Sequence, residues 1–319
     1  MKNFRYLSLV LMLLLFCGRP EVTEPGASFT IIGDCSLPGY ANDVELVDNL
    51  AYVANGQGGL QIIDISDPES TFVIAQYVAY GWDANAVAVR DTFAYVALSP
   101  SGGGLLVLSI ADPTQPFSVG QDGSFSAYDV VAPPGDTMYV YVAGGYWFYV
   151  WDIHYLSYAR RLKTYGDIIG VRMVDTLAYL SCEQMGLWIF NLASQDTLPL
   201  GMIDTPSNAR NLFVQGDYVY IADGRAGLII INATDPGNLA IVGEYDTDYY
   251  ANAVYVSGEK AYVADGDGGI EVVNVSDPSE PQYYGSIRTS YANGISVRGD
   301  TLYVADRDMG LVLIVEEAQ

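Results

Sequence analysis

The chain has 319 residues, half of them hydrophobic, and its 38 acidic and 14 basic residues give a formal charge of −24. A surface this acidic repels phosphate backbones and anionic membrane surfaces, which argues against a nucleic-acid partner. The 26 tyrosines and the other aromatic residues favour β structure.

The first predicted element is a signal peptide over residues 1–17. Two basic residues precede an apolar run from Leu7 to Phe16, which is too short to span a bilayer. Cys17 follows in a context that resembles a bacterial lipoprotein signal, although Phe16 is larger than the residue usual before a lipidated cysteine. We expect an exported protein, either a cell-envelope lipoprotein lipidated at Cys17 or an extracellular one, with residues 18–27 as a short linker. Membrane contact is expected only through that lipid anchor.

After the linker, one unit of about 42 residues is repeated seven times. A tyrosine in the second β run of each unit anchors the alignment, with spacings of 40 to 44 residues. We expect these tyrosines to pack between units. They are Tyr52, Tyr95, Tyr139, Tyr179, Tyr220, Tyr262 and Tyr303.

Each unit reads as four short β strands joined by turns. A glycine turn precedes the third strand, and an Asp-Pro pair, read as turn chemistry, often follows it. In the first unit the strands are expected at residues 43–47, 50–54, 60–65 and 71–78.

Seven such units predict an all-β fold, a seven-bladed β-propeller of four-stranded antiparallel blades over residues 28–319. The seventh unit ends after its third strand, at residues 311–316, whereas residues 28–42 begin with the sequence of a fourth strand. We therefore predict that the N-terminal strand completes the last blade and closes the ring. Cys35 and Cys182 are expected to be free, buried thiols on opposite sides of the ring.

The third strands carry a recurring apolar sequence, flanked by the glycine turn and often by Asp-Pro. This combination resembles the LVIVD repeat family of bacterial and archaeal β-propeller proteins, over essentially the whole chain after residue 28. The resemblance implies a propeller and an exported or surface-associated protein, and it implies no particular activity. The strands read LQIIDI, LLVLSI, FYVWDI, LWIFNL, LIIINA, IEVVNV and LVLIVE.

An asparagine stands just before the first strand in four units, and the other three units have Tyr128, Ile169 or Arg210 there. This position and the turn between the second and third strands are expected on one face of the propeller, here called the ring face. The asparagines either cap local backbone or, with nearby aromatic residues, form a surface suited to sugars, peptides or cationic groups. The binding-face candidates are Trp82, Tyr128, Arg210, Arg307, Asn42, Asn85, Asn252 and Asn293.

Residues for catalysis or metal binding are sparse in the sequence. His154 is the only histidine, which excludes a histidine-based metal site, and no catalytic residue is assigned. Asp265 and Asp267 imitate part of a calcium loop, but their segment continues directly into a strand, so they are weak metal candidates. No cofactor is expected, with calcium as the one ion considered.

These features favour a non-enzymatic cell-surface or secreted scaffold that binds a protein or a glycan through the ring face. The alternative is a propeller hydrolase or lyase that uses aspartates at the mouth of the central channel, with or without calcium. A purely structural envelope component is a third hypothesis.

Overall fold

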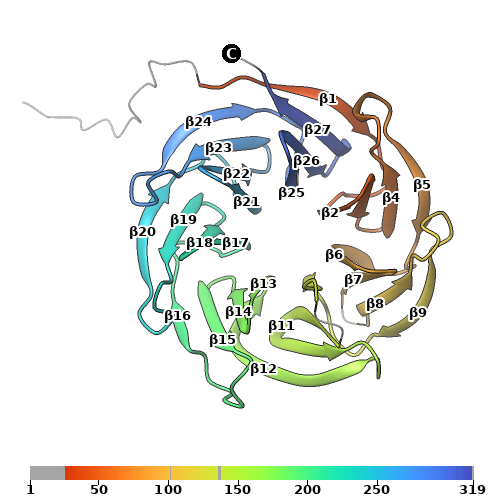
Figure 1. Ribbon diagram of the computed structural model, residues 1–319, viewed down its shortest axis with the longest axis horizontal. Coiled ribbons are helices and arrows are strands. Elements are labelled where there is room, and N and C mark those ends of the chain that lie inside the picture. The colour runs from red at the N-terminus through yellow and green to blue at the C-terminus, as the bar shows by residue number, and fades with distance from the viewer. Residues whose placement is uncertain (1–25, 101, 136–137, 318–319) are drawn as a thin grey trace, which may run out of the picture.

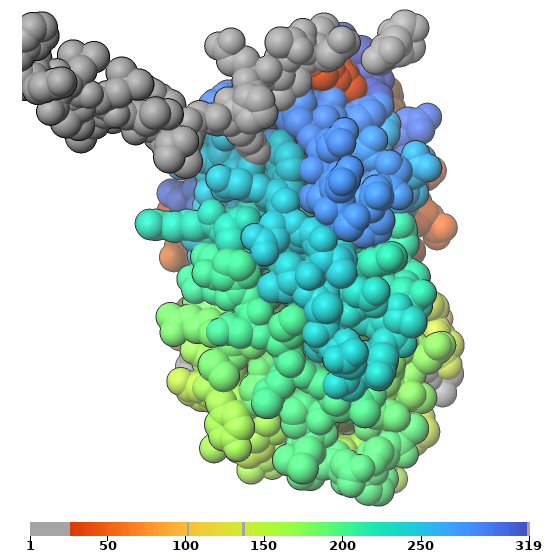
Figure 2. Space-filling model, turned by 90° about the vertical axis from the view of Figure 1, so that its left-hand side faces the viewer, coloured from red at the N-terminus to blue at the C-terminus, as the bar shows by residue number. Residues whose placement is uncertain are grey.

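The computed structural model describes residues 26–100, 102–135 and 138–317. Seven antiparallel sheets surround a central axis, with the first strand of each blade nearest the axis and the fourth at the rim (Figure 1). Figure 2 views the ring from its rim, where consecutive blades lie in chain order. The predicted seven-bladed propeller is confirmed. The predicted signal peptide 1–17, with Cys17, lies outside the described residues, as does most of the predicted linker 18–27.

The two inner positions of each blade are occupied by short strands. The first strands are β2 (Asp43–Val47), β6 (Asp83–Arg90), β10 (Asp129–Val131), β13 (Gly170–Val174), β17 (Asn211–Gln215), β21 (Ala253–Ser257) and β25 (Ala292–Arg298). The second strands are β3 (Leu50–Ala54), β7 (Phe93–Ser99), β14 (Leu177–Ser181), β18 (Tyr218–Ala222), β22 (Lys260–Ala264) and β26 (Thr301–Asp306).

The two outer positions complete the blades. The third strands are β4 (Leu60–Asp64), β8 (Gly104–Ser109), β15 (Leu187–Asn191), β19 (Leu228–Asn232), β23 (Ile270–Asn274) and β27 (Gly310–Glu316). The fourth strands are β5 (Phe72–Tyr77), β9 (Phe117–Asp122), β12 (Ser157–Ile168), β16 (Gly201–Ile203), β20 (Ala240–Tyr245), β24 (Gln282–Ile287) and β1 (Phe29–Cys35). The single 3-10 helix of the described residues is η1 (Pro68–Ser70).

Blade 3 differs from the other blades because its second and third strands form one continuous element, β11 (Tyr139–Asp152). The first part of β11 pairs with β10, and the last part pairs with β12. The change of partner occurs at Gly144 and Gly145, where Gly145 has a φ of +60°, a conformation that glycine adopts readily.

The strand register also corrects the sequence alignment in blade 3. Tyr52 lies opposite Glu45 in blade 1, and the residue in the corresponding place of blade 3 is Tyr141, which lies opposite Val131. Tyr139 was therefore the wrong equivalent. The connection between the first two strands is longer in blade 3 than in blade 1. A tyrosine chosen by spacing alone therefore falls two residues before the true equivalent.

The N-terminal strand closes the ring, as predicted. β1 pairs antiparallel with β27 from Phe29 opposite Glu316 to Cys35 opposite Leu311, and the sheet order is β1-β27-β26-β25. Just before β1, the Ala27 amide donates a 2.8 Å hydrogen bond to the Tyr284 carbonyl of blade 6. The last blade is thus completed by a segment from the other end of the chain.

The core consists of seven apolar layers, each between two neighbouring blades. Successive side chains of a strand point to opposite faces of its sheet, and both faces are covered here. In β4, for example, Ile62 packs between blades 1 and 2, whereas Ile63 packs between blades 7 and 1. This burial on both faces explains why the third strands are almost continuously apolar. Cys35 and Cys182 are free and buried in two different layers, as predicted.

Turns after the third strands use the expected Asp-Pro chemistry. In each of the four cases the aspartate carboxylate accepts a hydrogen bond from the backbone amide two residues ahead, at 2.9 to 3.1 Å. The aspartates are Asp67, Asp112, Asp235 and Asp277.

Candidate ligand-binding face

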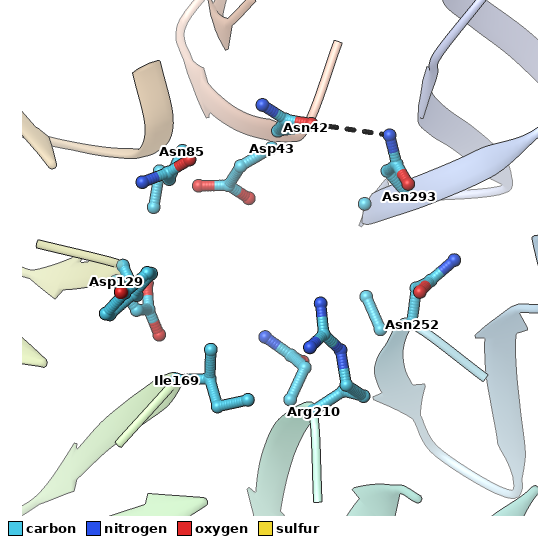
Figure 3. A pocket seen from close by; sticks show the side chains of 13 residues that line it. Asn42, Asp43, Asn85, Asp129, Ile169, Arg210, Asn252 and Asn293 are labelled. Carbon is cyan, nitrogen blue, oxygen red and sulfur yellow. Dashed lines mark hydrogen bonds between the residues drawn. The ribbon is translucent and has the colours of Figure 1, made fainter. Parts of the chain in front are cut away.

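One position near the start of each first strand forms a ring around one mouth of the central axis. It directly precedes the strand in five blades and lies inside the strand in β6 and β25. All seven residues at this position line a single cavity of about 180 Å³, here called the ring cavity (Figure 3). Side chains more than 250 residues apart in the sequence therefore converge on one space. The seven are Asn42, Asn85, Tyr128, Ile169, Arg210, Asn252 and Asn293.

The four asparagines bond between blades. The side-chain amide of Asn42 donates to the Ala84 carbonyl at 2.9 Å, and that of Asn85 donates to the Ala127 carbonyl at 2.7 Å. Both acceptors belong to the next blade along the chain, so the hypothesis of local capping was wrong about the partner. The blades stand close enough at the axis for a short side chain to reach the adjacent backbone. We call each such bond a latch.

The other two asparagines continue the set of latches. Asn252 of blade 6 donates to the Ala292 carbonyl of blade 7 at 3.0 Å. Asn293 of blade 7 donates to the Ala41 carbonyl ahead of blade 1 at 2.9 Å. Latches therefore cross the four boundaries from blades 6/7 to blades 2/3, here called the latched arc. The boundaries 3/4, 4/5 and 5/6, here called the open arc, have Tyr128, Ile169 and Arg210 instead.

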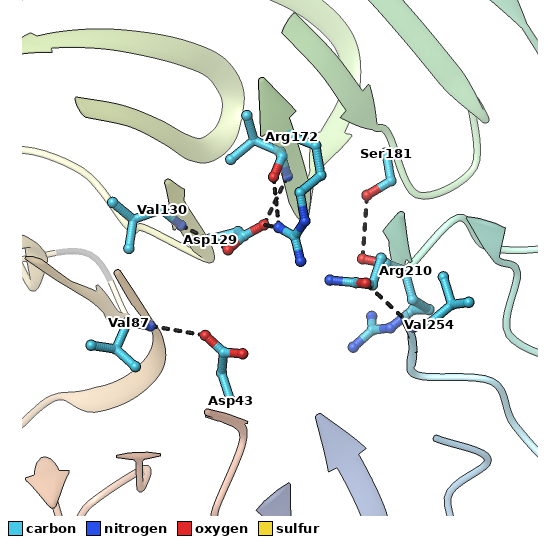
Figure 4. A network of polar contacts seen from close by, with 10 residues as sticks. Asp43, Val87, Asp129, Val130, Arg172, Ser181, Arg210 and Val254 are labelled. Atoms are coloured by element: carbon cyan, nitrogen blue, oxygen red, sulfur yellow. Dashed lines mark hydrogen bonds and ion pairs between the residues drawn. The ribbon is translucent and has the colours of Figure 1, made fainter. Parts of the chain in front are cut away.

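One residue further along the first strands, a second ring alternates between long and short side chains. The long ones bond to the backbone amide of the next blade: Asp43 accepts from Val87 at 3.0 Å, and Asp129 accepts from Val171 at 2.8 Å (Figure 4). Asn211 accepts from Val254 at 3.4 Å. Alanine or glycine occupies this position in the other four blades. In chain order the residues that follow the ring positions are Asp43, Ala86, Asp129, Gly170, Asn211, Ala253 and Gly294, and all of them except Gly170 line the ring cavity.

At the 4/5 boundary the structure uses a different contact. The Ser181 hydroxyl lies 3.3 Å from the Arg210 carbonyl, to which it donates a hydrogen bond (Figure 4). A Cβ on Gly170 would come within 2.4 Å of that hydroxyl oxygen. Asp43, Asp129 and Ser181 were not among the residues predicted from the sequence. The two aspartates directly follow ring positions, and this placement was a signal that could have identified them.

Asp43 and Asp129 also line a second cavity of about 270 Å³, here called the lower cavity, on the opposite side of the second ring. Arg172 lies in this lower cavity with its guanidinium 3.2 Å from the Asp129 carboxylate. The two cavities therefore meet at a carboxylate-lined level of the axis.

Burial changes the acidity of these axial carboxyl groups. It raises the pKa of Asp43 to about 6, and the negative charge of Asp129 adds to that shift. Burial, together with the Asp43 charge, raises the pKa of Glu45 to about 7. The pKa of Asp129 is also raised by burial, although Arg172 opposes this shift. Part of the axial acid is therefore protonated near neutral pH.

Arg210 supplies the one basic side chain of the ring cavity. Its guanidinium lies 4.0 Å from the Glu183 carboxylate and is partly exposed. The cavity thus combines a guanidinium, a phenol, five amides and two carboxyl groups, which can donate and accept hydrogen bonds around a polar ligand.

Two predicted binding-face residues lie outside the ring cavity. Trp82 is partly buried against the layer between blades 1 and 2, and it lines a separate pocket with Tyr80. Arg307 is exposed between the rings of Tyr40 and Tyr291, with its guanidinium carbon 5.5 and 5.2 Å from their centres. The structure therefore brings six of the eight candidates together.

The weak metal candidates do not form a common site. Asp265 is buried, and its carboxylate accepts bonds from the Thr247 hydroxyl at 2.7 Å and the Tyr249 amide at 3.0 Å. Asp267 is exposed to solvent. Across residues 26–100, 102–135 and 138–317, no group of three histidine, cysteine or acidic residues is placed to hold a metal ion. The corresponding Asp223 is also buried and holds the loop that leads into its blade.

In the described part of the chain, no helix has the length and apolar character needed to cross a membrane.

Comparison with known proteins gives a family and a fold. The sequence profile of the LVIVD repeat matches five segments that together cover more than half of the chain, and residues 122–205, which hold most of blades 3 and 4, fall outside the matches. The matched segments are residues 38–78, 81–121, 206–247, 249–289 and 290–315.

No curated protein matches the sequence. Among solved structures, the crystal structure of the computationally designed Ika8 protein is similar, with a TM-score of 0.65 and 11% sequence identity over 89% of this chain and 100% of that one. At this identity the likeness shows the fold alone. The five repeat matches show that the chain belongs to the LVIVD repeat family.

Proposed function

We propose that this protein is an exported, non-enzymatic scaffold that binds a protein or a glycan at its ring face. It is anchored through a lipidated Cys17 or secreted, as the sequence of residues 1–17 suggests. The observation that carries the binding proposal is the convergence of Tyr128, Arg210 and four asparagines on the ring cavity. The charge of −24 weighs against nucleic acid as the ligand.

The open arc supplies the recognition groups in this proposal. Each asparagine of the latched arc donates a side-chain amide hydrogen to a carbonyl of the neighbouring blade. The Tyr128 phenol and the Arg210 guanidinium make no such bond to the next blade. A phenol and a guanidinium on one side of a polar cavity suit sugar hydroxyls or a peptide carboxylate.

The test uses the double variant Tyr128→Ala/Arg210→Ala on arrays of printed oligosaccharides and displayed peptides. A matched control, Phe72→Ala/Arg225→Ala, removes one exposed aromatic and one exposed arginine away from the cavity. Saturable binding by the unmodified protein should weaken at least about tenfold in the first variant and stay unchanged in the control, since one lost charged hydrogen bond costs about 1.5–3 kcal/mol. Equal binding by both variants, or no saturable ligand on either array, would contradict the proposal.

A second candidate function is that of a hydrolase or lyase with Asp43 and Asp129 as an acid-base pair. The supporting observation is that burial raises the pKa of both carboxyl groups at the level where the two cavities meet. Turnover of chromogenic glycosides that is abolished by Asp43→Asn or Asp129→Asn, with or without added calcium, would favour this function. Absence of turnover in calcium and in EDTA would remove it.

A further inference from the structure

The rim of blade 3 carries a cluster of basic and aromatic side chains that the ring face does not use. Arg161 and Lys163 are exposed on β12, the outermost strand of that blade. The Arg161 guanidinium carbon lies 4.2 Å from the ring centre of Trp147 and 5.3 Å from that of Tyr158. The Lys163 ammonium lies 5.8 Å from the Trp147 ring. We call these four residues the rim cluster.

The rim cluster lies on one flank of β12. Lys163 pairs with Trp147, and Arg161 pairs with Tyr149, whose ring contacts Tyr158 with 5.7 Å between centres. Tyr149 packs in the layer between blades 2 and 3, which places this flank toward blade 2. A register shift between Gly145 and Trp147 ends the regular pairing beyond Lys163.

The two cations of the rim cluster have no acidic partner. Within the described residues, neither Arg161 nor Lys163 has a carboxylate within 4.0 Å, whereas Arg172, Arg210, Lys260 and Arg307 each have one. Five other described cations, Arg90, Arg160, Arg225, Arg288 and Arg298, also lack a carboxylate at this distance, and what distinguishes Arg161 and Lys163 is that they lie on one flank of β12 beside the same Trp147 ring. Their positive charge is therefore available to a ligand.

Blades 3 and 4 expose more apolar side chains than the rest of the described molecule. Among the described residues, eleven of the eighteen exposed large apolar side chains lie between residues 129 and 205, the sequence of these two blades. Tyr155, in the turn before β12, is 75% exposed, and Tyr165, on β12, is 79% exposed and contacts the Trp188 ring of blade 4, on the other flank from the rim cluster. The repeat profile omits residues 122–205, so this surface coincides with the segment that departs from the repeat.

We propose that the rim cluster binds an acidic polysaccharide whose uronate groups pair with Arg161 and Lys163. The twelve-residue strand β12 offers a long, narrow surface of roughly 40 Å at about 3.3 Å per residue, which suits a linear polymer. Tyrosine rings stack on sugar faces, and guanidinium groups bind carboxylates through paired hydrogen bonds. A polymer with one charge per sugar is repelled less by the acidic remainder of the protein than densely charged nucleic acid is.

The test measures binding of polygalacturonate to the full chain by isothermal titration calorimetry, with neutral dextran in parallel. The variant Arg161→Gln/Lys163→Gln removes the two rim charges, and the control Arg225→Gln/Arg298→Gln removes two exposed charges elsewhere, so the net charge is the same. Affinity for polygalacturonate should fall at least tenfold in the rim variant, change less than twofold in the control, and weaken as salt rises. The variant Arg161→Lys/Lys163→Arg keeps both charges and should retain most of the affinity. Retained affinity would show that substitution at these two positions does not by itself unfold the strand.

The proposal would be overturned by no binding of polygalacturonate, by an equal loss in the rim and control variants, or by binding of a dT20 oligonucleotide as tight as that of polygalacturonate. A loss caused by Tyr128→Ala/Arg210→Ala and not by the rim variant would place the polysaccharide on the ring face, which supports the proposed function while contradicting the rim site.

Discussion

Blades 6, 7, 1 and 2 differ from blades 3, 4 and 5 at the ring position near the start of the first strand. In the first group an asparagine latches each blade to the next, as Asn42 does to the Ala84 carbonyl. In the second group Tyr128, Ile169 and Arg210 take that position and line the ring cavity. The repeated residue thus joins neighbouring blades, and its replacements are the groups that we propose for recognition.

The rim extends this contrast. Blade 3, where the latches end, also carries the unpaired cations of β12, and most of blades 3 and 4 departs from the repeat profile. Outside this sector, the glycines and apolar strands repeat because neighbouring blades must pack in the same way each time.

The largest expected effect comes from removing the closing strand, which belongs to the latched arc. Deletion of residues 28–37 removes the pairing of β1 with β27 and the buried side chain of Phe29. The loss should exceed about 5 kcal/mol in the free energy of unfolding, because a buried aromatic alone accounts for about 3–5 kcal/mol. Urea denaturation followed by circular dichroism measures it, and a deletion that leaves the midpoint unchanged would contradict ring closure by β1.

Stability should fall as the pH rises from about 4 to 8. The folded-state pKa values of Asp43, about 6, and Glu45, about 7, are raised, so the folded protein binds more protons in this range than the unfolded chain. This contribution is complete below the unfolded pKa values, near 4, and is lost as the pH passes the folded ones. The difference in the free energy of unfolding between pH 5 and pH 8 should be smaller for Glu45→Gln than for the unmodified protein, by on the order of 1–3 kcal/mol. Thermal melts at the two pH values measure it. The exposed change Glu69→Gln is the control, and an unaltered difference in Glu45→Gln would refute this assignment.

A smaller effect is expected from removing one latch. Asn42→Ala or Asn293→Ala should lower the free energy of unfolding by about 1–2 kcal/mol, because the neighbouring carbonyl loses its side-chain donor. Tyr128→Ala should cost less, because no latch is lost. Chemical denaturation of the three variants makes the comparison, and equal losses at all three positions would remove the distinction between the arcs.

The smallest effect is expected from adding a latch to the open arc. Ile169→Asn places an amide at the equivalent ring position of blade 4, and a bond to blade 5 would raise the free energy of unfolding by no more than about 1 kcal/mol. Thermal melts compare this variant with Ile169→Ala, which offers no donor. If the asparagine variant is no more stable than the alanine variant, the geometry of the open arc does not permit a latch.

The fold was predictable because periodic residues report on periodic packing. The apolar third strands, the Asp-Pro turns and the incomplete seventh unit gave the blade number and the closing strand. The error at Tyr139 arose where blade 3 lengthens a connection, since spacing alone does not reveal register. Where a blade departs from the repeat, as blade 3 does, the spacing of repeated residues no longer predicts the strand register.

The site was predictable only in part. Repeated spacing within the chain pointed to the asparagine ring, yet the partners of those amides lie 40 to 42 residues away for three asparagines and 252 for Asn293, and depend on how closely the blades approach each other. Trp82 and Arg307 share the ring face but lie outside the cavity, because position along a loop does not determine distance from the axis. The contact of Arg161 with the Trp147 ring depends on strand register, which places Lys163 opposite Trp147 and Arg161 opposite Tyr149 across a hairpin that the sequence did not resolve.

Hydroxyl-radical footprinting of the full-length protein in intact native cells, compared with the purified protein, tests most directly whether recognition lies in the open arc and the adjoining rim. We predict protection at Tyr128, Tyr158 and Tyr165, with unchanged reactivity at Tyr40 and Tyr80 of the latched arc. Protection concentrated at Tyr40 and Tyr80, with Tyr128 and Tyr158 as reactive as in the purified protein, would contradict the account.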